Sequence, residues 1–415
     1  MAVTLNTTTC IYCPSTGPFT KEHIFPAGLG GDDAFQLEDL VCGHCNTKVF
    51  GPLDQALMRR SPAALARIFL MTQGRRDGGA PQLDSNVVEM ADPISHLVEE
   101  MEIVAGGKFR VRPQMLFNGI MCPVQATDAD DMQAFVAKLA STLTDAVHVI
   151  VKEKTESSTS FHITTFAWDG SKYGQTETTT EKQLPAIGVW RETLTPSKTA
   201  KPDWIYVSRL FLRAEGQLVV RVLPQDDLSA ILNNARMVLD LLQKQPTFTS
   251  QSTEKPDVHI GMTMDMNLVH RAMAKTGVNH VCQEYGQAIV RLAAFDLVKQ
   301  AINTGSPQIN AQGWVDPKME RIFTQDQRPV HLAMLWPVAQ PDGTFNILFG
   351  IRLFGTPFQG IILAEGVALP LGAAPVIYTV HYEERRTERQ TLAEYLIAAV
   401  VPKLLDEGRT RAGLS

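Results

Sequence analysis

The sequence has few of the features that mark membrane, secreted or fibrous proteins. Among its 415 residues, no run reaches the roughly 18 consecutive apolar residues that a membrane-spanning helix needs, so we expect no contact with a membrane. The first residues contain neither a basic nor an apolar stretch. No secretory signal is therefore predicted, and a cytoplasmic location is expected. The chain also has no internal repeat or low-complexity tract, which excludes solenoids and fibrous arrays.

Excess charge of either sign is small. The chain has 38 Lys and Arg residues against 44 Asp and Glu residues, and its net charge is −6. This balance argues against a protein whose whole surface binds nucleic acid, although a local basic patch is compatible with it. The hydrophobic content of 44% and the charged content of 20% are typical of folded globular domains.

Two turn-rich stretches divide the chain into three segments. The stretches cover residues 73–86 and 246–256, where Gly, Pro, Ser and Thr are frequent. The predicted domains are residues 1–72, 87–245 and 257–415, which agrees with a length sufficient for two or three domains.

Hydrophobic periodicity predicts a mixed α+β fold. Helices are predicted at residues 128–145, 227–243, 267–304 and 391–405. Strands are predicted at residues 109–111, 147–151, 160–166, 204–212, 218–223, 331–337, 345–354, 360–363 and 376–382. The turn Pro341-Asp342-Gly343 predicts a hairpin between two of these strands. Residues 174–181 are predicted to form a loop or a solvated edge, and the alternating residues Met262, Met264 and Met266 predict a buried strand.

Cysteine spacing gives the first chemical signal. Four of the six cysteines form two Cys-x-x-Cys pairs, which are Cys10 with Cys13 and Cys42 with Cys45. In a chain without an export signal, such pairs are more often metal ligands than disulfides. Four thiolates fill the tetrahedral shell of Zn²⁺ and leave no position for a reactive water. The sequence therefore predicts a structural zinc site.

The residues between the two pairs carry a family resemblance. Lys21-Glu22-His23-Ile24-Phe25-Pro26 is followed by Leu29-Gly30-Gly31, and then by Leu40-Val41-Cys42-Gly43-His44-Cys45-Asn46. This order resembles the HNH endonuclease family, within it the zinc-knuckle subgroup, and the resemblance covers residues 10–57. It implies a ββα-metal finger, in which two strands and a helix surround a catalytic divalent ion while the zinc knuckles hold the strand ends.

The same residues suit phosphodiester hydrolysis on chemical grounds. That reaction needs a base for the attacking water and a cation for the developing charge. A histidine such as His23 accepts protons near neutral pH. Glu22 and Asn46 offer hard oxygen ligands for Mg²⁺ or Mn²⁺. The resemblance implies that His23 is the general base and that Glu22 and Asn46 hold the catalytic ion.

Further residues near the motif have two interpretations each. The family's middle residue is usually an Asn that fixes the His-bearing loop; here the nearest candidates are Glu38 and Asp39, and Asp39 either positions that loop or caps a turn. Lys48 either contacts a phosphate or is simply solvated. Arg59 and Arg60 either follow a DNA backbone or belong to the solvated face of a helix.

These observations predict a metal-dependent endonuclease that cuts DNA, with RNA as an alternative substrate. Two cuts are needed to sever a duplex, so a homodimer is a plausible arrangement. Family habit suggests a role in restriction or anti-phage defence, with the remainder of the chain serving as a sensor, specificity or dimerisation module. Two other functions stay open. One is a non-catalytic zinc module that binds nucleic acid or protein, and the other is an effector nuclease switched on by an activating ligand or partner protein.

Overall fold

The computed structural model describes residues 9–71, 87–104, 107–119, 121–154, 159–196, 201–244, 256–313, 320, 323–324, 326–370 and 372–402. The chain forms two compact units. Unit 2 comprises residues 85–104 and 108–262, and unit 1 comprises residues 1–84, 105–107 and 263–415. The first and third segments that the sequence delimits thus pack into a single unit, with the middle segment as the other.

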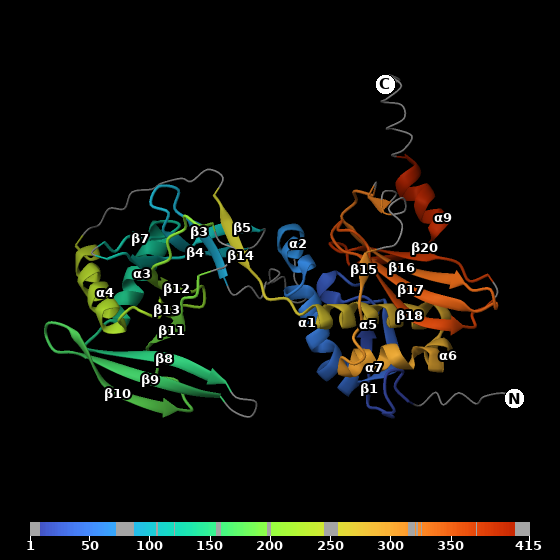
Figure 1. Cartoon of the computed structure of the whole chain (residues 1–415), viewed down its shortest axis with the longest axis horizontal. Coiled ribbons are helices and arrows are strands. Elements are labelled where there is room, and N and C mark those ends of the chain that lie inside the picture. The colour runs from blue at the N-terminus through green and yellow to red at the C-terminus, as the bar shows by residue number, and fades with distance from the viewer. Residues whose placement is uncertain are drawn as a thin grey trace, which may run out of the picture. The chain divides into compact units, whose positions relative to one another are not determined.

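Unit 2 is built on two sheets (Figure 1). An eight-stranded mixed sheet has the order β10-β9-β8-β11-β13-β12-β6-β7, and a four-stranded antiparallel sheet has the order β14-β3-β4-β5. The strands are β3 (Val87–Ala91), β4 (Val98–Val104), β5 (Lys108–Val111), β6 (Gln114–Phe117), β7 (Val124–Gln125), β8 (Ala146–Lys154), β9 (Thr159–Trp168), β10 (Tyr173–Glu181), β11 (Val189–Thr193), β12 (Ser208–Leu212), β13 (Leu218–Val222) and β14 (Val258–Gly261).

Two helices cover the larger sheet of unit 2. They are α3 (Ala129–Thr142) and α4 (Leu228–Leu242), and each begins after an aspartate, Asp128 or Asp227, whose side chain accepts a hydrogen bond from the first turn. Such caps satisfy backbone N–H groups that have no partner within the helix. Apolar residues of both helices and of the sheet form one buried cluster.

Unit 1 begins with a small hairpin and a run of helices. Strands β1 (Phe19–His23) and β2 (Gln36–Cys42) pair in antiparallel fashion, with an irregularity between Thr20 and Glu22. The helical elements are η1 (Ala27–Leu29), η2 (Cys45–Phe50), α1 (Gly51–Arg59) and α2 (Pro62–Leu70). Helix α1 ends at Arg59, and Ser61 caps α2, because the Ser61 side chain accepts a hydrogen bond from the backbone of Ala63.

The C-terminal part of unit 1 adds a helical layer and a sheet. The helices are α5 (Met266–Tyr285), α6 (Gln287–Val290), η3 (Ala293–Phe295), α7 (Asp296–Thr304), α9 (Leu392–Tyr395) and η4 (Leu396–Val400). The antiparallel six-stranded sheet has the order β15-β18-β17-β16-β19-β20, with β15 (Gln312–Gly313), β16 (Val330–Ala339), β17 (Phe345–Arg352), β18 (Gln359–Val367), β19 (Val376–His381) and β20 (Arg386–Thr391).

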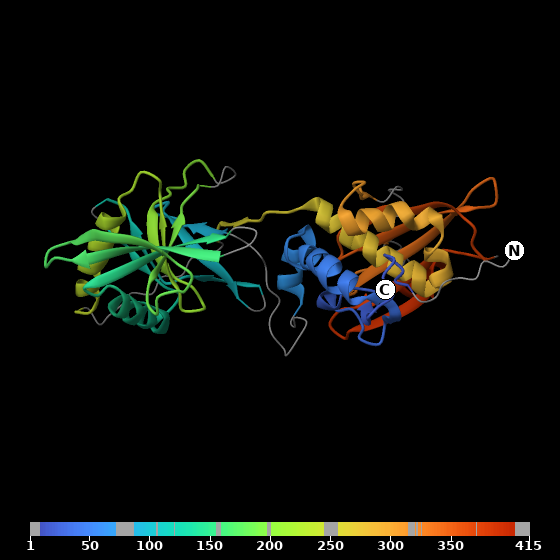
Figure 2. The same cartoon turned by 90° about the horizontal axis from the view of Figure 1, so that it is seen from below.

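Helix α5 is the centre of unit 1. It contacts α1 and α7 as well as the sheet strands β16, β17 and β18, and Figure 2 shows the helices of this region lying across the strands. The close approach to the sheet depends on Gly277, because a Cβ at this position would lie 2.7 Å from the ring of Phe349. One apolar cluster joins the N-terminal residues, α5 and the sheet into a single core.

The predicted α+β class is confirmed. The predicted helices at residues 128–145 and 227–243 coincide with α3 and α4, whereas the region 267–304 is broken into α5, α6, η3 and α7. Residues 174–181 belong to β10, an exposed strand at the edge of the sheet. The buried strand predicted at the three alternating methionines is wrong: β14 ends at Gly261, α5 begins at Met266, and Met264 is exposed. The predicted closing helix at residues 391–405 is described only as far as residue 402.

Among the described residues, no helix is both long enough and apolar enough to cross a membrane.

Candidate functional site

The four cysteines of the two Cys-x-x-Cys pairs come together at the base of the β1–β2 hairpin. Their sulfur atoms all lie within 4.8 Å of one another. The sulfur of Cys13 is 3.6 Å from that of Cys42 and 3.5 Å from that of Cys45. A tetrahedral zinc site with bonds of about 2.3 Å places neighbouring sulfurs about 3.8 Å apart. The cluster therefore fits a structural zinc ion.

The local backbone supports this cluster. The backbone N–H of Cys42 and that of Tyr12 point at the sulfur of Cys10, at 3.4 and 3.5 Å. Hydrogen bonding with Cys45 is the largest of the effects that lower the pKa of the Cys10 thiol, and this direction favours the thiolate form that binds metal. In the described part of the chain, no other group of three or more His, Cys, Asp or Glu side chains is arranged to hold a metal.

His23 ends strand β1, and its imidazole is 19% exposed. Its Nε2 atom lies 2.9 Å from Oδ1 of Asp33 and 3.0 Å from Nε2 of Gln36. The ring therefore either donates to the Asp33 carboxylate or accepts from the Gln36 amide, depending on its tautomer. Donation to Asp33 places the ring's lone pair on Nδ1. The hairpin supplies both partners. Gln36 is the strand partner of His23, and Asp33 lies in the connection between β1 and β2.

Glu22 lies on the other face of the same strand, because successive side chains of a strand alternate. It is only 4% exposed. Its Oε1 atom accepts hydrogen bonds from Lys275 Nζ at 2.8 Å and from Asn279 Nδ2 at 3.3 Å, both on α5. Burial raises the pKa of the carboxyl above its ordinary value, although the Lys275 ammonium opposes this shift.

Lys275 joins two parts of the N-terminal region. Its ammonium is fully buried and lies 2.8 Å from Glu22 and 3.0 Å from Asp54 of α1. Burial alone would lower the pKa of this lysine, but the two carboxylates outweigh it and hold the pKa above the ordinary value. The ring of Phe50 lies beneath the ammonium, 5.4 Å away.

Asn46 follows Cys45, the last cysteine of the cluster, and faces strand β1. Its Nδ2 atom donates to Oγ1 of Thr20 at 3.0 Å and to the carbonyl oxygen of Lys21 at 2.8 Å. The structure thus brings Asn46 against the strand that ends in His23. It does not bring the Glu22 carboxylate to this contact, because that carboxylate is bonded to α5.

The remaining sequence candidates lie around the hairpin and α1. Asp39 is exposed and adopts a φ of +55°, where the strand pairing of β1 and β2 is irregular. This geometry fits a turn-forming residue. Lys48 is exposed on η2, and Arg59 and Arg60 are partly exposed at the end of α1.

The comparison with known families assigns this part of the chain. Residues 10–61 match the HNH endonuclease family. We call these residues the HNH segment. No curated protein and no solved structure matches the chain. The HNH segment supports a nuclease-type function and a nucleic-acid substrate, and it contains the four-cysteine cluster.

Sequence reasoning missed several residues of this region. Asp33 and Gln36, which contact the His23 ring, carry no family signal. Lys275 and Asn279 lie far from the HNH segment in sequence, but a signal for them exists: they are polar residues four positions apart in a stretch of Ala, Val and Met. Such a pair shares one face of a helix, and buried Lys and Asn side chains need partners.

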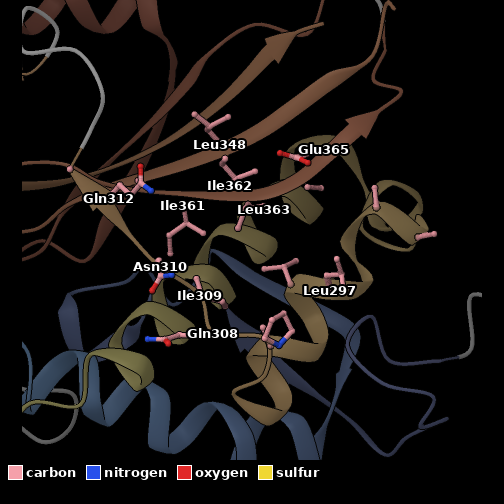
Figure 3. A pocket seen from close by; sticks show the side chains of 18 residues that line it. Leu297, Gln308, Ile309, Asn310, Gln312, Leu348, Ile361, Ile362, Leu363 and Glu365 are labelled. Carbon is pink, nitrogen blue, oxygen red and sulfur yellow. The ribbon is translucent and has the colours of Figure 1, made fainter.

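A cavity of about 570 Å³ lies elsewhere in unit 1 (Figure 3). Leu297 of α7 lines it together with Ile309 and Ile361 to Leu363 of β18. Among the described lining residues, none belongs to the HNH segment and Glu365 is the one ionisable side chain. Its described lining thus contains one carboxylate and neither a histidine nor a cationic side chain, so the HNH segment is the better candidate for phosphodiester hydrolysis.

Proposed function

We propose that this protein is a metal-dependent endonuclease that hydrolyses DNA phosphodiester bonds, with His23 as the general base. The observation that carries the proposal is the placement of His23. Its imidazole is partly exposed, its Nε2 atom lies within hydrogen-bond distance of Asp33 and Gln36, and it lies in a segment that matches HNH endonucleases. A histidine held by a carboxylate has one ring nitrogen fixed as donor and the other available for a proton.

A divalent ion, Mg²⁺ or Mn²⁺, would supply positive charge at the scissile phosphate. Oxygen-bearing side chains that contact β1 suit such an ion, which usually keeps several waters and takes one or two protein ligands. The side-chain oxygens of Asn46 and Asp33 are of this type, and we propose that Asn46 holds the ion. Glu22, the other ligand proposed from the sequence, bonds a buried ammonium, so it would have to release Lys275 to take this role.

The decisive experiment compares two histidines of the HNH segment. Purified protein is incubated with supercoiled plasmid, single-stranded DNA and RNA in Mg²⁺ or Mn²⁺. We expect wild type to cut DNA, and His23→Ala to lose on the order of 100-fold or more in rate. His44→Ala removes an exposed imidazole and serves as the matched control; it should retain activity. Equal zinc content in all three proteins shows that the fold is intact.

The substrate panel also separates the proposal from its alternatives. A non-catalytic zinc module would bind nucleic acid without cutting it, and an effector nuclease would cut only after a phage lysate or a nucleotide signal is added. Preferential cleavage of RNA would change the substrate class but keep the role of His23. If none of these conditions gives cleavage, the proposal is refuted.

A variant of Glu22 tests its role directly. If Glu22 binds the ion, Glu22→Gln should raise the Mg²⁺ concentration at half-maximal rate by about tenfold or more. If Glu22 is instead an anchor for α5, the variant should lower stability and leave that concentration unchanged. The structure favours the second outcome, because Glu22 is buried and paired.

We further propose that residues 87–415 serve recognition or regulation, in restriction or anti-phage defence, and that the protein acts as a homodimer. Support comes from size, since the HNH segment is too small to select a target by itself. Sedimentation with and without duplex DNA tests the dimer, and plaque assays with wild type and His23→Ala test the defence role.

A further inference from the structure

Helix α5 carries an unusual set of buried polar side chains. Lys275, Thr276, Asn279 and His280 are all 0% exposed, in the middle of a helix otherwise rich in Ala, Val and Met. Burying a charged or amide group is costly unless it finds partners. Lys275 and Asn279 are four residues apart, so they face the same side, and that side contacts the HNH segment.

The amide of Asn279 bonds at both of its ends. Its Nδ2 atom donates to the backbone carbonyl of His23 at 3.2 Å and to the Glu22 carboxylate at 3.3 Å. Its Oδ1 atom accepts from the hydroxyl of Tyr12 at 2.6 Å. Tyr12 lies between the first two cysteines. One side chain of α5 therefore links the cysteine cluster to the residue that we propose as general base.

Lys275 completes the same attachment from one turn earlier. It bridges Glu22 on β1 and Asp54 on α1. The strand and the helix of the HNH segment are thus held to one ammonium, which fixes their relative position. Removing the lysine would leave the buried carboxylate of Glu22 and the half-buried carboxylate of Asp54 poorly compensated.

We propose that Lys275 and Asn279 are positioning residues for His23, acting through the backbone and the buried face of β1. The inference rests on the proposed function of His23. Asp33 and Gln36 orient the imidazole, whereas α5 holds the strand that carries it. A displacement of about 1 Å in a reacting group lowers rates by about 100-fold, so a contact with the base's own backbone affects catalysis without touching the substrate.

Two consequences follow. Glu22 acts as the anchor of β1 on α5. The nuclease site also depends on a helix more than 200 residues away in the sequence, since the backbone carbonyl of His23 accepts a hydrogen bond from Asn279, 256 positions later. The HNH segment is therefore incomplete as a catalytic unit without residues 266–285.

The test uses the full-length, zinc-loaded protein and plasmid cleavage in Mg²⁺. Asn279→Ala removes both ends of the amide, and Asn279→Asp keeps the shape and the acceptor for Tyr12 but loses the donor to His23. We expect both variants to lower kcat by about 10- to 100-fold. The KM for DNA should change by less than about threefold, because Asn279 is buried and does not reach the substrate.

Two controls separate positioning from stability. Thr276→Val removes a buried hydroxyl of the same helix. In the described part of the structure, this hydroxyl donates to the backbone carbonyl of Ala272, one turn earlier in α5. Asn303→Ala removes another amide that ties the C-terminal region to the HNH segment, through the carbonyl of Tyr12 at 2.8 Å. Both should lower the unfolding temperature, and both should keep kcat within about twofold of wild type at a temperature where all proteins are folded.

The outcomes distinguish this inference from the function on which it rests. If wild type cuts and both Asn279 variants keep kcat within twofold, the inference is overturned and the function of His23 stands. If the controls lose as much kcat as Asn279→Ala, Asn279 contributes only stability, and the inference is again overturned. If wild type does not cut any substrate, the proposed function itself fails, and the inference fails with it.

Discussion

The two units of the protein bury charge in different ways. In unit 1, the buried ammonium of Lys275 joins segments that are more than 200 residues apart in sequence. In unit 2, the buried charges join strands of its two sheets, and Glu100 and Arg221 are 121 residues apart in sequence. Arg209 on β12 is directly opposite Arg221 on β13, and Glu100 of β4 contacts both.

The unit 2 network is redundant, whereas the unit 1 cluster is not. Arg221 bonds Glu192 as well as Glu100, and Glu192 also bonds Arg213. Each carboxylate therefore keeps an arginine if another is lost. Glu22 and Asp54 share a single lysine. A network with several partners keeps its carboxylates paired when one arginine is removed, whereas a single charged contact between distant segments makes the geometry of the HNH segment depend on α5.

Removal of zinc should destabilise unit 1 relative to unit 2 more than any of the substitutions below. In isolated zinc-finger peptides, structural zinc contributes on the order of 10 kcal/mol to folding, so chelation should unfold much of the HNH segment and loosen α5. Hydrogen exchange resolved by peptide should show faster exchange throughout unit 1 and unchanged exchange in unit 2. Cys122→Ser, in unit 2, is the control and should leave zinc content unchanged. Equal loosening of both units would contradict the assignment of zinc to this cluster.

Replacing one buried cationic side chain in each unit should lower the unfolding free energy of unit 1 more than that of unit 2. Lys275→Met leaves two carboxylates without their cation and should cost about 3–5 kcal/mol in the unfolding free energy of unit 1. Arg209→Met should cost unit 2 less than about 2 kcal/mol, because Arg221 still neutralises Glu100 and a like-charge contact across the strands is relieved. Urea titrations followed by hydrogen exchange measure both values. Similar losses would mean that redundancy does not distinguish the units.

The units should also respond to pH in opposite directions. Burial lowers the pKa of His280 in unit 1 to about 4. The unfolded chain therefore binds a proton below pH 6.5 that the folded chain does not, and the stability from this group is lost as pH falls from 6.5 towards 4. Burial raises the pKa of Glu99 in unit 2 to about 7. The stability that the protonated Glu99 gives to unit 2 is fully present below pH 4.5 and is lost as the pH rises through 7.

Variants isolate these two contributions. His280→Phe should reduce the fall in the stability of unit 1 between pH 6.5 and 4. Glu99→Gln should reduce the fall in the stability of unit 2 between pH 4.5 and 7. Each group should account for about 1–3 kcal/mol. Denaturation at several pH values, with exchange read out separately for each unit, tests the signs. Unchanged slopes in the variants would assign the pH dependence to other groups.

The smallest expected effect concerns the surface of the HNH segment. Arg59→Ala and Arg60→Ala should each weaken DNA binding by less than about tenfold and reduce the salt slope by about one. Binding is measured by fluorescence anisotropy in the His23→Ala background, so that DNA is not cut. Arg191→Ala, at an exposed position of unit 2, should leave binding unchanged if DNA contacts the HNH segment alone. A larger effect at Arg191 would move the interface to unit 2.

Local patterns in the sequence were sufficient for several parts of the structure. The Cys-x-x-Cys spacing predicted the four-sulfur cluster, because a two-residue gap brings the thiols of one pair together and two such pairs together supply the four ligands of a tetrahedral site. The two aspartate-capped helices of unit 2 followed from capping and apolar periodicity. The methionine alternation failed because three residues carry too little periodicity to distinguish a strand from a loop that enters a helix.

The partners of the candidate site could be predicted only in part. His23 and Asn46 were singled out by their motif, and the structure places Asn46 against the strand of His23. The partners of Glu22 were not predictable, because nothing within the HNH segment indicates that a lysine from a distant helix lies beside it. Adjacent positions in a strand face opposite sides, and which side meets which element is a property of the packed unit.

The sequence alone determined the α+β class, the two cysteine pairs that suit a zinc ion and the motif that matches HNH endonucleases, because these depend on residue type and short-range spacing. Tertiary structure alone decided that the HNH segment and the C-terminal region share one core, and that Lys275 and Asn279 hold the strand of His23. The physical reason is that a buried charge or amide is stable only beside complementary groups, and chain folding brings those groups together from positions that sequence spacing does not relate.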